Sequence, residues 1–175
     1  MVAVGRRAQQ MIGKGGNLIR TVRPLRDGVI ADFYACEMMI RGMIKMIPKQ
    51  NRLFTPSIRM VVCIPSGSTE VEIRAVRDSS EHAGGREVYM IYEPMAAAIG
   101  MGIDVEQPEG CMVVDIGGGV TDIAVISFNG IVASCSVNVG DSAFDEAIKN
   151  YLKKEYKMVI GDATAEKIKI NFACA

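Results

Sequence analysis

The residues best placed to do chemistry lie in one stretch, MVVDIGGGVTDIAVIS, residues 112–127. An apolar run ends at Asp115, three glycines follow at 117–119, and a second apolar run starts at Ile123. This pattern predicts two strands joined by a tight glycine turn. Glycine amides can point at phosphate oxygens, and Asp115 would stand where a divalent metal needs an oxygen ligand. A plain hairpin with a bulge also explains these residues. The turn differs from a Walker loop, which ends in G-K-[ST], because no such residues follow it here. It also differs from a dinucleotide fingerprint, which leads into a helix, because a strand is predicted after it.

The carboxylate of Glu93 is a second candidate. The run YEPMAAAIG, residues 92–100, predicts a helix with Pro94 in its first turn and with Gly100 and Gly102 at its end. A carboxylate at such a position can simply interact with the helix dipole. Beside the later D-x-G-G-G turn, Glu93 could instead orient a water molecule against a phosphate.

Strands and helices must position these groups in the first part of the chain. Runs 60–64 and 88–92 predict strands, and 69–83 predicts a charged helix. We expect Val71, Ala75, Val76 and Ala83 to face inward on that helix. Before them, a methionine-rich apolar face at helical spacing predicts a helix that packs in the core, with a partner groove as the alternative. That face consists of Met38, Met39, Ile40, Met43, Ile44 and Ile47.

Later elements have similar signals. Asn129-Gly130 predicts a hairpin whose returning strand covers 131–139. An apolar stripe then predicts an amphipathic helix; it consists of Phe144, Ala147, Ile148, Tyr151 and Leu152. The segment 105–110 is the best candidate for a boundary, which divides the chain into domains of residues 1–109 and 110–175. The mixture predicts an α/β fold of layered sheets and helices.

Composition excludes several classes of protein. Hydrophobic residues make up 49% and charged residues 23% of the 175-residue chain, which is typical of a globular domain. The formal net charge is +0, with no basic block, so no nucleic-acid partner is expected. The five scattered cysteines predict buried, reduced thiols, and the single histidine, His82, argues against histidine-centred chemistry. Arginines soon after Met1 make a secretory signal unexpected, and no apolar run approaches the roughly 20 residues that span a bilayer.

Several separated motifs together resemble a known family. The order IPSG, YEPMAAAIG, DIGGGVTDIAVIS is similar to the actin, Hsp70 and sugar-kinase ATPase superfamily. RPLRDGVIADF (23–33), the run 71–100 and TAEKIKI (164–170) more narrowly resemble the MreB family of bacterial actins. The resemblance implies an actin-like (ribonuclease H-like) ATPase fold of two related subdomains, incomplete here, with ATP and Mg²⁺ between them.

The resemblance also implies roles for individual residues. Glu93 matches the residue that orients the attacking water, and Asp122 stands where related proteins place a second polar residue that positions this water. Thr121 is implied to be a further catalytic residue, and Asp115 matches the residue that acts on magnesium, largely through water. Such roles suit phosphoryl transfer, which needs mainly positioning and charge stabilisation. Gly117, Gly118 and Gly119 match a phosphate turn. Glu166 and Lys169, on one helix face by their spacing, match residues that contact the nucleoside.

The chain departs from the family pattern at two positions. Val120 stands where the family has the first threonine of GGGTT, which removes a hydroxyl. Asp141 stands where the family commonly has the second glycine of a pair, a problem if that position needs positive φ. The family's first phosphate turn and late G-G motif are not found in these residues. The chain is therefore expected to be an internal piece of a longer protein, and its first sheet is expected to have unpaired edges.

The dipeptide Leu53-Phe54 stands out in a polar loop. It can pack locally, but the same pair in MreB proteins implies insertion into the cytoplasmic face of the inner membrane. Two side chains contribute only a few kcal/mol even when buried, so stable anchoring would need many subunits.

The resemblance implies a rod shape-determining cytoskeletal protein. Such a protein is cytoplasmic and peripheral on the inner membrane, binds and slowly hydrolyses ATP, forms filaments, and works with cell-wall elongation proteins. This chain alone is not expected to hydrolyse ATP. Two alternatives remain open: a fragment of an Hsp70-like chaperone ATPase and an ATPase-inactive, truncated interaction module.

Overall fold

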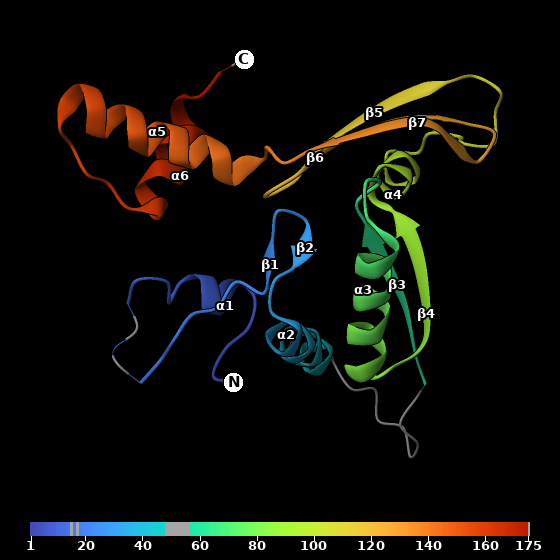
Figure 1. Ribbon diagram of the computed structural model, residues 1–175, viewed down its shortest axis with the longest axis horizontal. Helices are drawn as coiled ribbons and strands as arrows, with labels where there is room; N and C mark the ends of the chain where they lie inside the picture. Colours follow the sequence, from blue (N-terminus) through green and yellow to red (C-terminus); the bar gives the residue numbers. More distant parts are fainter. Residues whose placement is uncertain (15, 17, 48–56, 175) are drawn as a thin grey trace.

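The computed structural model describes residues 1–14, 16, 18–47 and 57–174. Strands and helices are interspersed along these ranges, and the strands form three separate small sheets (Figure 1). A short helix α1 (Arg6–Gln9) is followed by a small antiparallel hairpin of β1 (Leu25–Arg26) and β2 (Val29–Ile30). The mixed α/β class predicted from the sequence is confirmed.

A parallel pair of strands forms the centre of the first part. Strand β3 (Ile58–Ile64) pairs with β4 (Gly85–Tyr92) through the crossover helix α3 (Glu70–His82). The N-terminus of α3 has a capping box, in which Thr69 and Glu72 satisfy each other's backbone amides. The predicted strands and helix are confirmed, but Val71 is 78% exposed and faces outward, because the helix turns its Ser79 and Ser80 side inward instead.

Helix α2 (Phe33–Met46) begins at Asp32, whose side chain accepts a hydrogen bond from the Ala35 amide. The predicted helix is confirmed. Its apolar face is only partly buried, however, since the buried residues of α2 are Cys36 and Gly42 and since Met43 is exposed. The absence of a side chain at Gly42 leaves room for Met1, which packs there.

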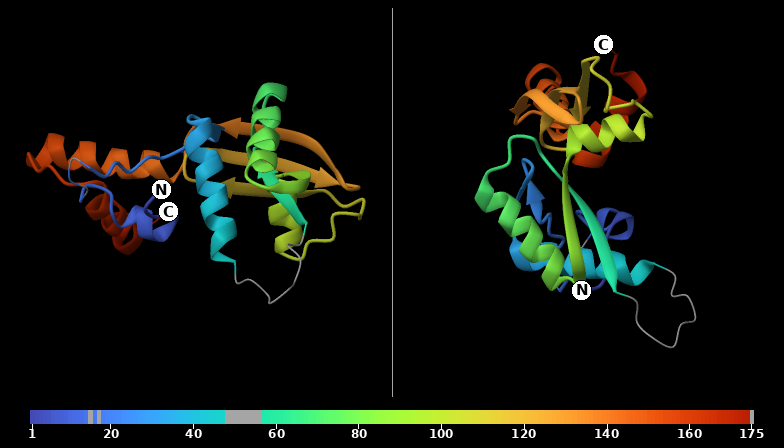
Figure 2. Two further views of the ribbon diagram at one scale, coloured as in Figure 1. Left: turned by 90° about the horizontal axis from the view of Figure 1, so that it is seen from below. Right: turned by 90° about the vertical axis from the view of Figure 1, so that its right-hand side faces the viewer.

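The second sheet is antiparallel, in the order β5 (Cys111–Ile116), β6 (Thr121–Ser127) and β7 (Gly130–Val137). Helix α4 (Glu93–Gly100) packs on one face of it, and Ala98 of the helix joins Val113, Ala124 and Ile126 of the sheet in the main buried cluster. The helix thus lies between the two sheets (Figures 1 and 2). The division at residues 109 and 110 stays a prediction.

The β6–β7 hairpin turns one residue earlier than predicted. Phe128 and Asn129 have positive φ, and Ser127 faces Gly130 across the ladder, so Gly130 already belongs to β7. Two consecutive residues at positive φ are typical of the type I′ turn, whose twist suits a hairpin. The predicted hairpin is confirmed, with this shift in its centre.

Two helices complete the described chain, α5 (Asp141–Tyr156) and α6 (Asp162–Phe172). Ile148 and Leu152 of the predicted stripe are half-buried and line a hollow together with Ile168 of α6, but Phe144 and Tyr151 are exposed. None of the helices in the described ranges is long and apolar enough to cross a membrane.

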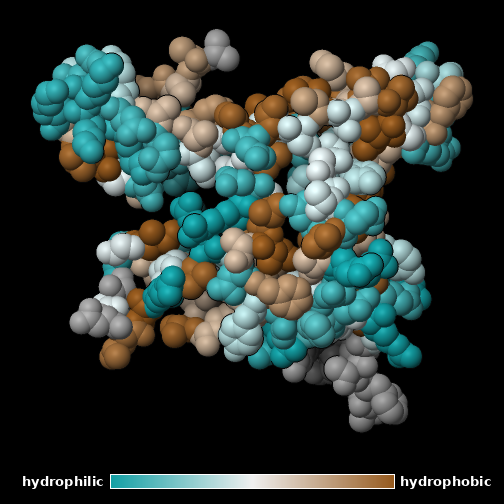
Figure 3. Space-filling view, in the orientation of Figure 1, coloured by the Kyte–Doolittle hydropathy of each residue, from teal (hydrophilic) through white to brown (hydrophobic). Residues whose placement is uncertain are grey.

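Much apolar surface remains open. Strands β3 and β4 each have one unpaired edge among the described residues, as predicted, and Val61 and Tyr89 are exposed on their open face. Apolar side chains also gather over the far end of the β5–β7 sheet (Figure 3), where Phe128 and Val132 are exposed.

The prediction of buried thiols is wrong for most cysteines: Cys36 is buried, whereas Cys63, Cys135 and Cys174 are exposed and Cys111 is half-buried. All five are free, as predicted.

Candidate functional site

The glycine turn between β5 and β6 closes on itself through a hydrogen bond from the Gly117 amide to the Val120 carbonyl, at 2.9 Å. None of its three glycines has positive φ. Their importance here is space: a Cβ at Gly119 would come within 3.0 Å of the Asp27 backbone, whereas one at Gly118 would meet nothing within 4 Å. The turn therefore needs glycine for close backbone approach, and Gly118 faces an open volume.

The start of α5 holds this turn from the other side. The amides of Asp141 and Ser142 donate to the carbonyls of Gly117 and Gly118, both at 2.9 Å. Within the described chain, the amides of Gly118 and Gly119 donate to no protein acceptor. These two N–H groups are the ones that remain available for an anion.

The departure at Asp141 has a structural explanation. The residue has no positive φ, because it is the first residue of α5, where an acidic side chain is favourable. The steric constraint falls on Gly140 instead, where a Cβ would lie 2.5 Å from the Gly117 carbonyl oxygen. The departure at Val120 also has a packing partner, since this side chain is buried and lies close against Gly28.

Three carboxylates from three elements converge beside the turn. Glu93 is the first residue of α4, directly after β4, and is half-buried. Burial raises its pKa above the ordinary value, and the negative charges of Asp122 and Asp115 raise it further. The pKa of the nearby Cys63 thiol is raised by burial and then by Glu93 and Asp115. The structure therefore brings together the acidic residues predicted at 93, 115 and 122.

Asp115 and Asp122 face each other directly across the β5–β6 ladder. Like charges at opposed positions destabilise a strand pair, so the pairing of these two carboxylates is unfavourable by itself. Among the described residues, no group of three His, Cys, Asp or Glu side chains is arranged to hold a metal ion by itself. A magnesium contact by Asp115 stays a prediction, and water molecules and phosphate oxygens would have to supply the remaining ligands.

Asp122 is buried, with 1% of its surface exposed. Its Oδ1 accepts hydrogen bonds from the Ser66 hydroxyl at 2.7 Å, from the Ser66 amide at 3.2 Å and from the Ser136 hydroxyl. The sequence analysis missed both serines: Ser66 lies in the IPSG motif, but nothing in the sequence singles out Ser136. Thr121 donates its hydroxyl to the Val139 carbonyl at 2.7 Å. The catalytic roles predicted for Asp122 and Thr121 stay predictions.

Lys169 is held by two acidic residues of α5. Its Nζ lies 2.6 Å from Asp141 Oδ1 and 2.8 Å from Asp145 Oδ1. The contact with Asp145 is an ion pair whose geometry does not make a hydrogen bond. Burial lowers the pKa of Lys169, but its bonds and ion pairs with both aspartates outweigh that effect and raise it. The predicted nucleoside contact by Lys169 stays a prediction, and its ammonium group already has two partners.

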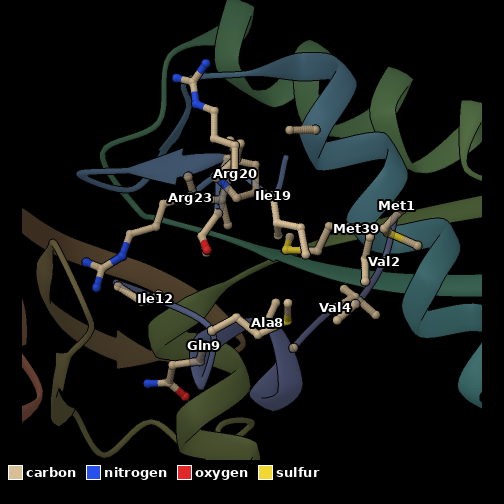
Figure 4. A pocket seen from close by; sticks show the side chains of 18 of the residues that line it. Met1, Val2, Val4, Ala8, Gln9, Ile12, Ile19, Arg20, Arg23 and Met39 are labelled. Carbon is tan, nitrogen blue, oxygen red and sulfur yellow. The ribbon is translucent and has the colours of Figure 1, made fainter. Parts of the chain in front are cut away.

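A cavity of about 730 Å³ lies beside these residues. Its walls come from the N-terminal segment, α2 and the beginnings of α5 and α6, where the molecule is hollowed in the space-filling view (Figures 3 and 4). Glu166 lines it together with Asp141 and Asp145. Met39 and Ile19 make part of the apolar wall, and Arg20 and Arg23 lie at its margin (Figure 4).

Leu53 and Phe54, predicted to contact a membrane, lie outside the described residues.

Comparison with known proteins identifies the family to which this chain belongs. All residues, 1–175, match the family described as MreB/Mbl protein. The cell shape-determining protein MreB of Escherichia coli K12 is 53% identical over 169 residues, which are 97% of this chain and 48% of that protein. The cell shape-determining protein Mbl of Bacillus subtilis 168 is 47% identical over 173 residues, 99% of this chain and 51% of that protein. The chain thus spans about half the length of the curated relatives it matches.

Solved structures agree. MreB5 of Spiroplasma citri bound to ADP has a TM-score of 0.84 and 38% identity, and the match covers 96% of this chain and 50% of that one. A chain of the MamK double helical filament has a TM-score of 0.75 at 20% identity, covering 97% of this chain and 51% of that one, which shows the fold alone. The described chain is half of an actin-like α/β fold, and by sequence and structure it belongs to the MreB/Mbl family.

Proposed function

We propose that this chain supplies one wall of an adenine-nucleotide site in a cell shape-determining, actin-like protein of the MreB/Mbl family. The observation that carries this proposal is the convergence of Glu93, Asp115 and Asp122 beside a turn with two unengaged glycine amides. MreB5 of Spiroplasma citri, 38% identical, was solved with ADP and with AMPPNP, which supports nucleotide binding by the family. Membership in the MreB/Mbl family favours this function over the Hsp70-like alternative.

The residues present suit ATP with a divalent cation. Gly118 and Gly119 would donate their amides to phosphate oxygens, and the open space at Gly118 allows close approach. Bound ATP·Mg²⁺ would supply the phosphoryl group and the positive charge that this acidic site requires. Asp115 would hold the cation, largely through water, because Mg²⁺ usually retains part of its hydration shell.

Glu93 would orient the attacking water. It lies at the entrance of α4, and its raised pKa makes it a better proton acceptor when ionised than an ordinary glutamate. Glu166, on the cavity wall, would contact the nucleoside, and Lys169 would do so from its ion pair with Asp141. The complete protein would hydrolyse ATP slowly, whereas this chain alone would not.

We further propose that the complete protein forms filaments beneath the inner membrane and acts there with cell-wall elongation proteins. The names of its relatives support the role in cell shape. The apolar pair Leu53-Phe54 would contact the cytoplasmic face of the membrane. Its small contribution per subunit requires a filament to make binding stable.

Hydrolysis by a complete MreB/Mbl polypeptide that carries this segment tests the proposal. Glu93→Gln should retain ATP binding and slow turnover by about 10²-fold or more, because removal of a positioned acid–base group typically costs that much. Glu81→Gln, on the exposed end of α3, is the matched control and should leave turnover unchanged. Unchanged turnover in Glu93→Gln would overturn the role of Glu93. Absence of ATP binding by the unaltered protein would favour the ATPase-inactive interaction module.

A further inference from the structure

A single carboxyl oxygen connects the β5–β7 sheet to the loop that follows β3 of the β3–β4 sheet. Asp122 Oδ1 accepts hydrogen bonds from Ser66, through both hydroxyl and amide, and from the Ser136 hydroxyl. The two serine hydroxyls also lie 3.3 Å apart. Asp122 and Ser136 are paired across the β6–β7 ladder, whereas Ser66 belongs to the loop that follows β3. The bond to Ser66 therefore crosses between sheets that share no strand.

The backbone is shaped for this contact. Gly67, next to Ser66, approaches β7 so closely that a Cβ there would lie 2.8 Å from Ser136 Oγ. A second close approach joins a different pair of elements: Gly119 meets the backbone of Asp27, between β1 and β2, so the β5–β6 turn also contacts the β1–β2 hairpin. The β5–β7 sheet thus makes both of these contacts through a glycine, Gly67 at one and Gly119 at the other.

Asp122 is buried without a basic partner among the described residues. Asp122 is 1% exposed, and within the described chain no basic side chain lies within ion-pair distance of it. A buried carboxyl group without hydrogen-bond donors is strongly unfavourable. Its three donors compensate for that burial. Separation of the two parts would exchange both Ser66 bonds for bonds to water, so these bonds favour the closed arrangement by the net value of hydrogen bonds to a charged group.

The same residue affects the candidate site. Asp122 faces Asp115 across the ladder, and its charge acts on Glu93. A movement of Asp122 relative to the β3–α3 loop would therefore change the surroundings of both carboxylates.

We propose that Ser66, Asp122 and Ser136 form a hydrogen-bonded latch between the β3–β4 and β5–β7 sheets, and that the two serines are positioning residues for the nucleotide site. Asp122 then has a holding role in place of the predicted contact with attacking water. The latch stands without the proposed function; only its effect on nucleotide affinity rests on that function.

Amide hydrogen exchange of Ser66, measured by NMR on this chain, tests the latch. Ser136→Ala removes one donor to Asp122 without touching the Ser66 amide. If the three residues act as one unit, exchange at Ser66 should become at least about tenfold faster, because bonds to charged groups contribute roughly that much or more. Ser134→Ala, an exposed position on the same strand, is the control and should leave the Ser66 rate unchanged. An unchanged rate in Ser136→Ala would overturn the latch.

A second measurement separates the two claims. Titration of the same variants with Mg·AMPPNP should show weaker binding for Ser136→Ala and Ser66→Ala than for Ser134→Ala. Faster exchange at Ser66 with unchanged affinity would contradict the positioning role. Absence of binding by the unaltered chain would count against the proposed function, while the exchange experiment would still decide whether the latch exists.

Discussion

A Cβ atom at Gly140 would lie 2.5 Å from the carbonyl oxygen of Gly117, which is closer than a side-chain carbon and a backbone oxygen can approach. Gly140 is buried immediately before α5, so its lack of a side chain allows the helix start to pack against the glycine turn. This contact explains why the turn and α5 depend on each other.

Gly140→Ala should therefore destabilise the chain, whereas Gly118→Ala should not. Overpacking typically costs about 1–3 kcal/mol, and here the clashing atoms are backbone, which cannot rotate away. Gly118 has open space and no positive φ, so alanine there should leave stability unchanged or slightly raised. Urea unfolding measures both, and equal stability of the two variants would contradict this account of the turn.

The capping box of α3 makes a second prediction. Thr69→Ala should lower the free energy of unfolding by about 1 kcal/mol, because the Glu72 amide loses its acceptor. Thr69→Ser should retain most of the stability, and Ser68→Ala, one residue earlier, is the control. A loss of equal size in Ser68→Ala would show that the effect is not due to the cap.

The raised pKa of Glu93 predicts a stability change that depends on pH. Burial, then Asp122 and Asp115, hold its pKa above the ordinary value of 4.5 in the folded state. Between 4.5 and the folded value, the folded protein binds more protons than the unfolded chain, so stability falls as pH rises through that window. Glu93→Gln should therefore raise Tm at neutral pH, and the gain should disappear as pH falls below 4.5. A gain that persists at lower pH would contradict the assignment.

Lys169 should join α5 to α6. Lys169→Met removes the cation that faces both Asp141 and Asp145, so Tm should fall at neutral pH. The pKa of Lys169 is raised on folding, so its contribution to stability should be complete below the ordinary value of 10.5 and should be lost above it. Thermal unfolding at neutral pH and at a pH above the folded pKa of Lys169 measures this contribution. Lys167→Met, at an exposed position on the same helix, is the control at each pH. Equal Tm of the two variants at neutral pH would exclude this role.

Membrane contact by Leu53 and Phe54 predicts that Leu53→Ser with Phe54→Ser reduces recovery of filaments with anionic liposomes without stopping polymerisation. The apolar side chains contribute a few kcal/mol per subunit, which a filament multiplies. Val159→Ser, at an exposed apolar position of the described chain, should leave recovery unchanged. Equal recovery of all variants by flotation would indicate that the pair packs locally.

Local patterns predicted most elements of this fold. Alternation and run length located the strands, and charge and apolar spacing located the helices. The outward position of Val71 and the shift of the hairpin turn to Phe128 depend on which residues the rest of the molecule covers, which periodicity does not contain.

The candidate site was predictable only in part. The D-x-G-G-G turn and Glu93 have local signatures, and the structure brings them together. Ser66 and Ser136 lie 56 and 14 residues from Asp122 along the chain, and a serine has no spacing signal of its own. The glycines at 117–119 were predicted for their approach to a ligand, yet Gly119 is first required by its contact with the Asp27 backbone. Gly140, which the sequence analysis did not single out, is required by its contact with the backbone of the glycine turn.

The most direct test of the central claim is an NMR titration of the isotopically labelled chain with Mg·AMPPNP, since NMR detects even the weak binding expected of one wall of a site. The account predicts saturable shifts of the Gly118 and Gly119 amide resonances, with weaker binding by the stable variant Gly118→Ala. If a folded chain shows no change at these two amides at millimolar nucleotide, or the same affinity after Gly118→Ala, the glycine turn is not the phosphate-binding element proposed here.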